Sequence, residues 1–359
     1  MDSDTLSIRD GLVARDPTVK TEQHIKVAVL LATYNGAQFV EPQIRSLKEN
    51  TTPFTLHWLD DHSTDTTREI VRSTARSADI ELAEWHQPRH LGLPLNFFQL
   101  VECVEADIYL FCDQDDIWQP GKIDATVNNL LADVASPVLC FSDTIIFRDS
   151  EPRTYQFASD IVGKAKITSA MQGPPTFGIF SPALPYGHTE GFTRGVREIY
   201  LRHKTIARTY AHMHDSWMYD ITVASGTVRM LSNVPTSLWR RHEKSNSNSV
   251  GGPGRLGFIR RAWRTSQLFR QLVSRHAQGF LLAAPTLPPT QNLDRLLEFA
   301  QLISIIDRRL SPADLVRMSR RGAKLHWHSL RHQALFLVAC LSTDASRSNV
   351  KDHRLQSLA

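Results

Sequence analysis

Three carboxylates lie within four residues of this chain, at Asp113, Asp115 and Asp116, and they are its strongest chemical signal. They directly follow the apolar residues 109–112, a pattern typical of a buried strand. Carboxylates this close repel one another unless a cation lies between them, and their hard oxygen atoms suit Mg²⁺ or Mn²⁺. Both ions commonly bridge protein carboxylates to substrate phosphates, so the cluster predicts a divalent metal beside a phosphorylated substrate.

Two further polar groups end apolar runs in the same way. They are, in chain order, Thr33, Tyr34 and Asn35 at the end of residues 25–33, and Asp60 and Asp61 after residues 54–59. Ligands of parallel sheets bind outside the carboxyl ends of the strands, where all three groups would meet. The alternative for residues 113–116, a solvated acidic turn, is disfavoured by this coincidence.

Strand-like and helix-like segments alternate over the first 145 residues. The expected strands are residues 25–33, 54–59, 80–85, 108–112 and 138–141. Helical patterns separate them, including residues 94–104 and 122–134, and Thr66 with Glu69 forms a capping-box pattern at the start of another. This alternation predicts a three-layer α/β/α sheet with right-handed crossovers.

The 359 residues divide into three parts by composition. Residues 1–23 mix charges without periodicity and are expected to form a flexible leader. Residues 24–250 should form the catalytic domain, and a Ser-, Asn- and Gly-rich linker at 245–254 leads into a helical region at 251–359. No apolar run approaches the roughly 20 residues that cross a bilayer, and the N-terminus resembles no signal peptide, so a cytoplasmic location is expected.

The C-terminal region is basic, with 17 Lys and Arg against 6 Asp and Glu from residue 251 onward. Arginines alternate with apolar residues over residues 255–275, which predicts a basic amphipathic helix. Two interpretations stay open: contact with anionic lipid at the inner face of the membrane, or packing on the catalytic domain with solvated arginines. No nucleic-acid-binding motif accompanies the charge, so no nucleic-acid partner is expected.

Four segments, taken in order, resemble the family 2 glycosyltransferases, and most closely their rhamnosyltransferase-like group. They are residues 27–36, residues 60–67, residues 113–118 with Lys122, and the motif His214-Asp215-x-Trp217. The resemblance implies a GT-A fold and an inverting displacement at the anomeric carbon of a nucleoside-diphosphate sugar. The acceptor would be a hydroxyl of a glycan, a lipid-linked or a small-molecule compound, and the rhamnosyltransferase-like group implies rhamnose as the sugar.

The resemblance also implies a role for each site residue. The nucleotide would contact Thr33, Tyr34, Asn35, Asp60, Asp61 and Asp113. The metal ligands would be Asp113, Asp115 and His242, with Arg240 or Arg241 on the diphosphate. Asp215 would be the general base that takes a proton from the acceptor hydroxyl.

Three alternatives remain beside this interpretation. Asp215 is also suited to capping a helix N-terminus. The carboxylates and the metal could instead serve phosphoryl or nucleotidyl transfer, although Ile117-Trp118 depart from the pattern of haloacid-dehalogenase-type phosphatases. A catalytically silent nucleotide-binding module is the third. His188 and Glu190 stand where the family commonly has small or apolar residues, which leaves the acceptor and the donor sugar open.

Overall fold

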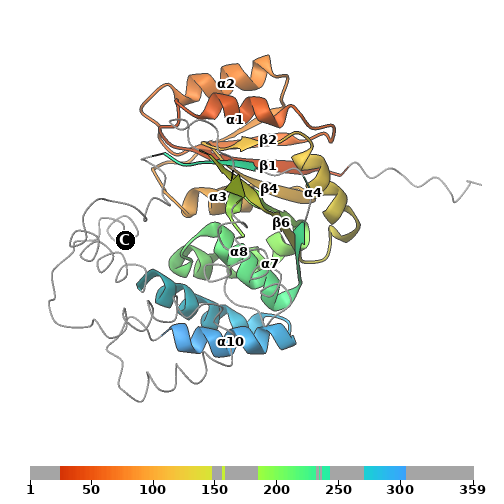
Figure 1. Cartoon of the computed structure of the whole chain (residues 1–359). Helices are drawn as coiled ribbons and strands as arrows, with labels where there is room; N and C mark the ends of the chain where they lie inside the picture. The colour runs from red at the N-terminus through yellow and green to blue at the C-terminus, as the bar shows by residue number, and fades with distance from the viewer. Residues whose placement is uncertain are drawn as a thin grey trace, which may run out of the picture.

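The computed structural model describes residues 25–147, 156–157, 185–231, 234, 237–242 and 271–304. Its centre is a seven-stranded sheet with the strand order β10-β6-β9-β4-β1-β2-β3. Helices cover both faces of this sheet (Figure 1). The predicted three-layer arrangement is therefore confirmed.

The central strand β1 (Val27–Thr33) is buried along its whole length. Its side chains alternate between two apolar cores, so Leu30 enters the core on one face of the sheet and Leu31 enters the core on the other. A strand that is covered on both faces reads as a continuous apolar run, which is why the sequence predicts it well.

Parallel pairing brings the polar ends of three strands together. β1 pairs with β2 (Thr55–Asp60) and with β4 (Ile108–Asp113). The register places Thr33 opposite Asp60 and Ala32 opposite Asp113. The three polar groups that the sequence singled out thus meet at one edge of the sheet.

The remaining strands complete two sheets. β3 (Leu82–Trp85), β6 (Val138–Ser142) and β10 (Thr227–Leu231) extend the large sheet in parallel. β9 (Glu190–Thr193) runs antiparallel between β4 and β6, and the sequence patterns did not predict it. A second sheet contains β5 (Ile117–Trp118), β11 (Ser237–Arg240), β7 (Thr144–Phe147) and β8 (Gln156–Phe157).

The helices divide between the two faces of the large sheet. One core is shared with α1 (Val40–Leu47), α2 (Thr67–Ser77) and α4 (Lys122–Leu130). The other is shared with α3 (Leu95–Cys103), α7 (Arg194–Tyr210) and α8 (His214–Ser225).

The predicted capping box at the start of α2 is wrong. The side chain of Thr66 makes no capping hydrogen bond, because its backbone (φ −78°, ψ 15°) lacks the extended conformation that a capping residue needs. Asp65 takes the role instead, and its carboxylate accepts the backbone N–H of Thr67 at 3.1 Å.

The described part of the C-terminal region is helical and packs on the core that contains α8. Residues 271–283 are helical, and α10 (Gln291–Ile303) follows them. Phe280 and Phe299 are buried in the same core as the side chains of α3 and α8. The predicted leader, the linker at 245–254 and most of the basic segment 255–275 lie outside the described residues. Among the helices that the structure describes, none combines the length and the apolar character needed to cross a bilayer.

Candidate active site

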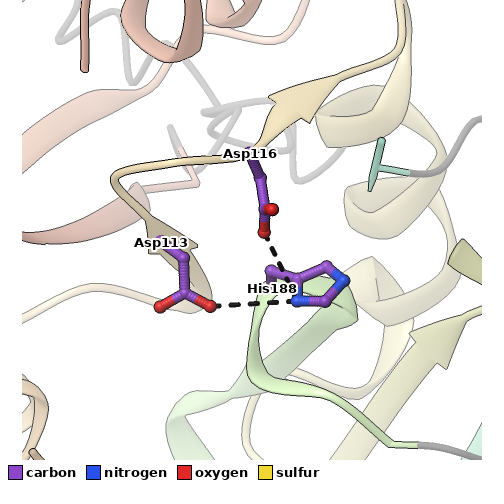
Figure 2. A group of neighbouring side chains, drawn as sticks. All are labelled: Asp113, Asp116 and His188. Carbon is purple, nitrogen blue, oxygen red and sulfur yellow. Dashed lines mark ion pairs between the residues drawn. The ribbon is translucent and has the colours of Figure 1, made fainter. Parts of the chain in front are cut away.

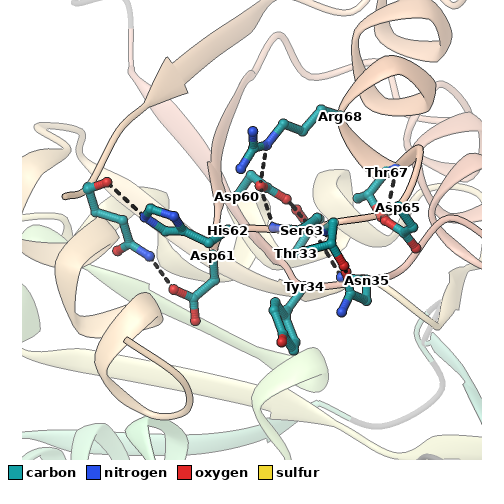
Figure 3. A network of polar contacts seen from close by, with 12 residues as sticks. Thr33, Tyr34, Asn35, Asp60, Asp61, His62, Ser63, Asp65, Thr67 and Arg68 are labelled. Carbon is teal, nitrogen blue, oxygen red and sulfur yellow. Dashed lines mark hydrogen bonds and ion pairs between the residues drawn. The ribbon is translucent and has the colours of Figure 1, made fainter. Parts of the chain in front are cut away.

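The loop after β1 is fixed by hydrogen bonds and presents one exposed ring (Figure 3). The side-chain amide of Gln114 brackets the backbone of Tyr34, accepting its N–H at 2.9 Å and donating to its carbonyl at 3.1 Å. The backbone N–H of Asn35 donates to Ser63 Oγ at 2.9 Å. Tyr34 is 45% exposed, and its ring lies 4.4 Å from the His90 ring, centroid to centroid. An exposed ring on a rigid loop can stack on a nucleobase.

Asp60 is an ionised carboxylate that organises the end of β2. It accepts hydrogen bonds from Thr33 Oγ1 at 2.9 Å, Arg68 Nε at 2.6 Å, and both the backbone N–H and the hydroxyl of Ser63. Burial alone would raise the pKa of Asp60, but the hydrogen bonds from Ser63, Arg68 and Thr33 outweigh it and hold the pKa below its ordinary value.

Asp61 is completely buried and fixes the neighbouring loop. Its carboxylate accepts the backbone N–H groups of Leu91 at 2.7 Å and Gly92 at 2.6 Å, and the side-chain amide of Gln87. The structure thus places both predicted nucleotide-binding acids at the edge of the sheet, where their carboxylates are engaged by protein donors. They shape the walls of the site through the loops that they hold.

Asp113 and Asp116 converge on His188 (Figure 2). The Nδ1 atom of His188 lies 3.4 Å from Asp116 Oδ2 and 3.8 Å from Asp113 Oδ2. Asp116 Oδ1 accepts the backbone N–H of Arg240 at 3.1 Å, whereas Asp116 Oδ2 is buried and has no hydrogen-bond partner among the described residues. One donor atom from each of Asp113, Asp116 and His188 lies within 4.8 Å of the others, so this group could hold a metal ion.

The hydrogen bonds of His188 show which of its nitrogens faces the carboxylates. Its Nε2 lies 3.1 Å from Thr144 Oγ1, and the Thr144 hydroxyl donates to the carbonyl of Ser237 at 2.9 Å. Thr144 Oγ1 therefore accepts from Nε2–H, and Nδ1 keeps its lone pair. Burial, assisted by the charge of Lys122, lowers the pKa of His188 well below its ordinary value, so the ring is neutral. A lone pair facing two carboxylates is the donor set that a hard divalent cation requires.

The carboxylates themselves are crowded. Burial, followed by the charges of Asp115 and Asp215, raises the pKa of Asp113 to about 8. Burial, followed by the charges of Asp115 and Asp113, raises the pKa of Asp116 well above its ordinary value. A divalent cation would reverse both shifts by compensating the negative charge. The residues present therefore fit a metal ion.

The predicted metal ligands Asp115 and His242 also meet. His242 Nε2 lies 2.8 Å from Asp115 Oδ2, and the His242 ring stacks on Phe39 with centroids 4.3 Å apart. Within the described part of the chain, however, the three-ligand group around Asp113 is completed by Asp116 and His188. His188 was missed as a candidate ligand, and its departure from the family pattern was the one signal that could have found it.

The two candidate diphosphate ligands lie on aromatic rings beside this group. The Arg240 guanidinium lies 4.7 Å from the Phe147 ring centroid, and its Nε donates to the Asp115 carbonyl at 2.9 Å. The Arg241 guanidinium lies 4.6 Å from the Trp239 ring centroid. Arg240 is the last residue of β11 (Ser237–Arg240) and Arg241 follows it, and this strand pairs with β5, the short strand after the acidic cluster.

Asp215 lies in the first turn of α8, and the prediction that it caps this helix is wrong. The helix begins at His214, because Met213 is the last residue with an extended backbone. Asp215 Oδ2 accepts the backbone N–H of Gly187 at 3.0 Å, and Oδ1 accepts that of Ser216 at 2.6 Å. Since the charge of Asp215 contributes to the raised pKa of Asp113, the two carboxylates belong to one site.

Two buried ionisable side chains accompany Asp215. The His214 ring lies 4.1 Å from the Phe97 ring and 4.6 Å from the Phe111 ring, and burial lowers the pKa of His214 to about 4. Burial, followed by the charges of Asp215 and Asp220, raises the pKa of Glu190 well above its ordinary value. Neither side chain has a hydrogen-bond partner within the residues that the structure covers. The surroundings of Asp215 are thus apolar or neutral.

Comparisons with known proteins agree on one family. The model of the family described as "Glycosyl transferase family 2" matches residues 28–186. The dTDP-rhamnosyl transferase RfbG of Shigella flexneri is 26% identical over 245 residues, which are 65% of this chain and 80% of that protein.

Two solved structures are similar to the fold. The mannosyltransferase PcManGT from Pyrobaculum calidifontis, in complex with GDP-Man and Mn²⁺, has a TM-score of 0.51 at 18% identity, over 93% of this chain and 90% of that chain. Residues 1–349 of S. aureus TarS have a TM-score of 0.49 at 14% identity, over 88% of this chain and 79% of that chain.

Proposed function

Because this chain belongs to the family 2 glycosyltransferases and has a GT-A fold, we propose that it moves a sugar from a nucleoside-diphosphate donor to an acceptor hydroxyl with inversion. One observation carries the proposal: Thr33, Asp60 and Asp113 meet through strand register, and Asp215 on α8 lies near enough for its charge to act on Asp113. The similarity to a dTDP-rhamnosyl transferase supports dTDP-rhamnose as the donor.

The donor nucleotide would lie over the ends of β1 and β2. The exposed ring of Tyr34 would stack on the base, and the loops held by Asp60 and Asp61 would border the ribose. Asn35, whose amide oxygen accepts the backbone N–H of Thr64 at 2.8 Å, would close the pocket behind the base. These groups are fixed before a ligand arrives, which reduces the entropy that binding must offset.

The diphosphate would lie between the acidic cluster and β11. Asp113 would hold Mg²⁺ or Mn²⁺, either with Asp115 and His242 or with Asp116 and His188. Arg241, whose guanidinium lies on the Trp239 ring, would add a positive charge. The metal supplies Lewis-acid stabilisation of the charge that develops on the departing diphosphate. Two observations support these metal ligands: the contact between Asp115 and His242, and the uncompensated negative charge of the carboxylates around Asp113.

Asp215 would act as the general base. Its Oδ2 is oriented by the Gly187 N–H, and its Oδ1 is oriented by the Ser216 N–H. A carboxylate held in this way can remove the proton of an acceptor hydroxyl as that oxygen attacks the anomeric carbon from the face opposite the diphosphate. Positioned bases contribute about 10²- to 10⁴-fold to a rate.

The acceptor would be a hydroxyl group of a glycan, of a lipid-linked compound or of a small molecule. The same proposal includes contact between the basic segment 255–275 and anionic lipid of a membrane. The charge of that segment supports it. Flotation with anionic vesicles at low and high salt tests the contact. Binding that is lost at high salt is expected, and no binding at low salt would remove this part of the proposal.

Turnover of a donor panel tests the proposed reaction. The protein is incubated with Mn²⁺ or Mg²⁺ and with dTDP-, UDP- and GDP-sugars, and the released products are identified. Slow release of a nucleoside diphosphate, with water as the acceptor, is expected with one donor and should disappear in Asp115→Ala. Release of inorganic phosphate or pyrophosphate instead would favour phosphoryl or nucleotidyl transfer.

A further inference from the structure

The helix that carries Asp215 is held from behind by residues far along the chain. Residues 271–283 and α10 lie against α8 on the side away from the large sheet (Figure 1). Gly279 lies between α7 and α8, because a Cβ atom at that position would lie 2.3 Å from Cβ of Tyr210, the last residue of α7, and 3.4 Å from Cζ3 of Trp217 on α8. The segment therefore contacts both helices.

One side chain of this segment, His276, makes two polar contacts, one to α8 and one to the loop before it. Its Nδ1 accepts the backbone N–H of His212 at 3.0 Å, and its Nε2 lies 2.8 Å from Asp220 Oδ2. The side chains of His276 and Asp220 are both 1% exposed or less. A neutral imidazole offers one acceptor and one donor, so these two bonds use both nitrogens of the ring. The contacts require the Nε2–H form of His276.

These two bonds bracket the turn that carries Asp215. His212 lies three residues before Asp215, and Asp220 lies five residues after it. The backbone between them changes from extended at Met213 to helical at His214, which sets the direction in which the Asp215 carboxylate leaves the helix. The far end of α8 is held as well, because the Thr290 hydroxyl donates to the Ala224 carbonyl at 2.7 Å.

We propose that His276 is a positioning residue that sets the direction of Asp215. The proposal rests on the proposed role of Asp215 as the base. His276 touches no substrate in this account. It acts through the backbone at His212 and through Asp220.

Four variants separate this role from general stabilisation. His276→Ala removes both bonds. His276→Asn retains an acceptor near the position of Nδ1, facing His212, and His276→Gln places a donor near the position of Nε2, facing Asp220. The matched control is Thr286→Ala, which removes a 2.7 Å contact between Thr286 Oγ1 and His203 Nε2. That contact joins the same C-terminal segment to α7, which does not carry Asp215.

Hydrogen exchange and donor turnover are measured on all four variants. In His276→Ala, exchange of the amides of residues 212–218 should be about tenfold faster than in the wild type, and kcat should fall about tenfold, because a displacement near 1 Å costs up to about 10²-fold. The KM for the donor should stay within about twofold, since the donor groups lie on other elements. His276→Asn should recover more of kcat than His276→Gln, and Thr286→Ala should leave exchange at 212–218 and kcat unchanged.

Two results would overturn the proposal. The first is amide hydrogen exchange at residues 212–218 that is unchanged in His276→Ala. If the alanine variant does not fold, the same result in both His276→Asn and His276→Gln would overturn the proposal. The other is faster exchange with a kcat equal to that of Thr286→Ala. If the wild-type protein turns over no donor, the proposed function fails, whereas the exchange comparison still decides whether His276 fixes the Asp215 turn.

Discussion

Gly187 lies against the turn that carries Asp215, and a single added methyl group tests how tightly that turn is set. In Gly187→Ala the new Cβ would lie 2.9 Å from His214 Nε2 and 3.5 Å from Asp215 Oδ2. Ordinary contacts of this kind begin near 3.4 Å, so a gap of about 0.5 Å must open. His214 cannot retreat, because its ring is stacked on Phe97 at 4.1 Å in the buried core.

The displacement must therefore be shared between the Gly187 loop and the first turn of α8. It stretches the 3.0 Å hydrogen bond from the Gly187 N–H to Asp215 Oδ2. Since a 1 Å misplacement can cost about 10²-fold, a shift of about half that size should lower kcat about tenfold. Overpacking should also lower the free energy of unfolding by about 1–3 kcal/mol. The KM for the donor should stay within about twofold.

The assay is steady-state turnover of the nucleoside-diphosphate sugar in a double-mutant cycle with His214→Ala. Removing the imidazole removes the overlap, so adding Gly187→Ala to His214→Ala should cost less than about twofold in kcat. The two substitutions are then strongly coupled. Equal losses in both backgrounds, or a loss confined to KM, would refute the reasoning.

Three further predictions concern the metal, the nucleotide and the C-terminal region. Because burial and Asp115 raise the pKa of Asp113 to about 8, a cation must displace a proton from Asp113 when it binds. The apparent Mn²⁺ affinity should therefore fall close to tenfold from pH 7 to pH 6, measured by a titration followed by electron paramagnetic resonance. An affinity that does not change between these pH values would contradict the prediction. Tyr34→Ala should weaken nucleoside-diphosphate binding about 5- to 10-fold in calorimetry, since stacking contributes about 1 kcal/mol, whereas Tyr34→Phe should bind like the wild type. Phe299 is 1% exposed in the core shared with α8, so Phe299→Ala should lower the free energy of unfolding by about 3–5 kcal/mol. Urea denaturation should show a single transition, because the C-terminal helices and α8 share that core. A separate early transition would contradict the shared core.

The parts of the fold that the sequence predicts are those in which local pattern and burial agree. β1 and β4 are apolar on both faces, so their extent and the polar residues that follow them could be read directly. β9 could not, because its four residues contain Gly191 and Glu190 and lack any apolar alternation. Packing decides its place between β4 and β6. A Cβ atom at Gly191 would lie 2.3 Å from Thr126 Cγ2, so the strand fits there because this residue is glycine.

The same distinction applies to the site. Asp113, Asp115 and Asp215 carry signals in their own segments, so the sequence alone singles them out as candidates. His188 and Glu190 reach the site only because the insertion of β9 brings their segment beside β4. His188 meets Asp113 and Asp116, which are more than seventy positions away in the sequence, and no local pattern encodes such a contact.

Substitution of Asp215 tests the central claim most directly. Asp215→Asn keeps the side chain nearly isosteric and retains one oxygen that can accept the Gly187 N–H, so the fold and the donor site should be unchanged. Calorimetry should give nucleoside-diphosphate binding in the presence of Mn²⁺ that matches the wild type, while kcat falls about 10²- to 10⁴-fold. Turnover that remains within a few fold of the wild type, with binding intact, would contradict the assignment of Asp215 as the base.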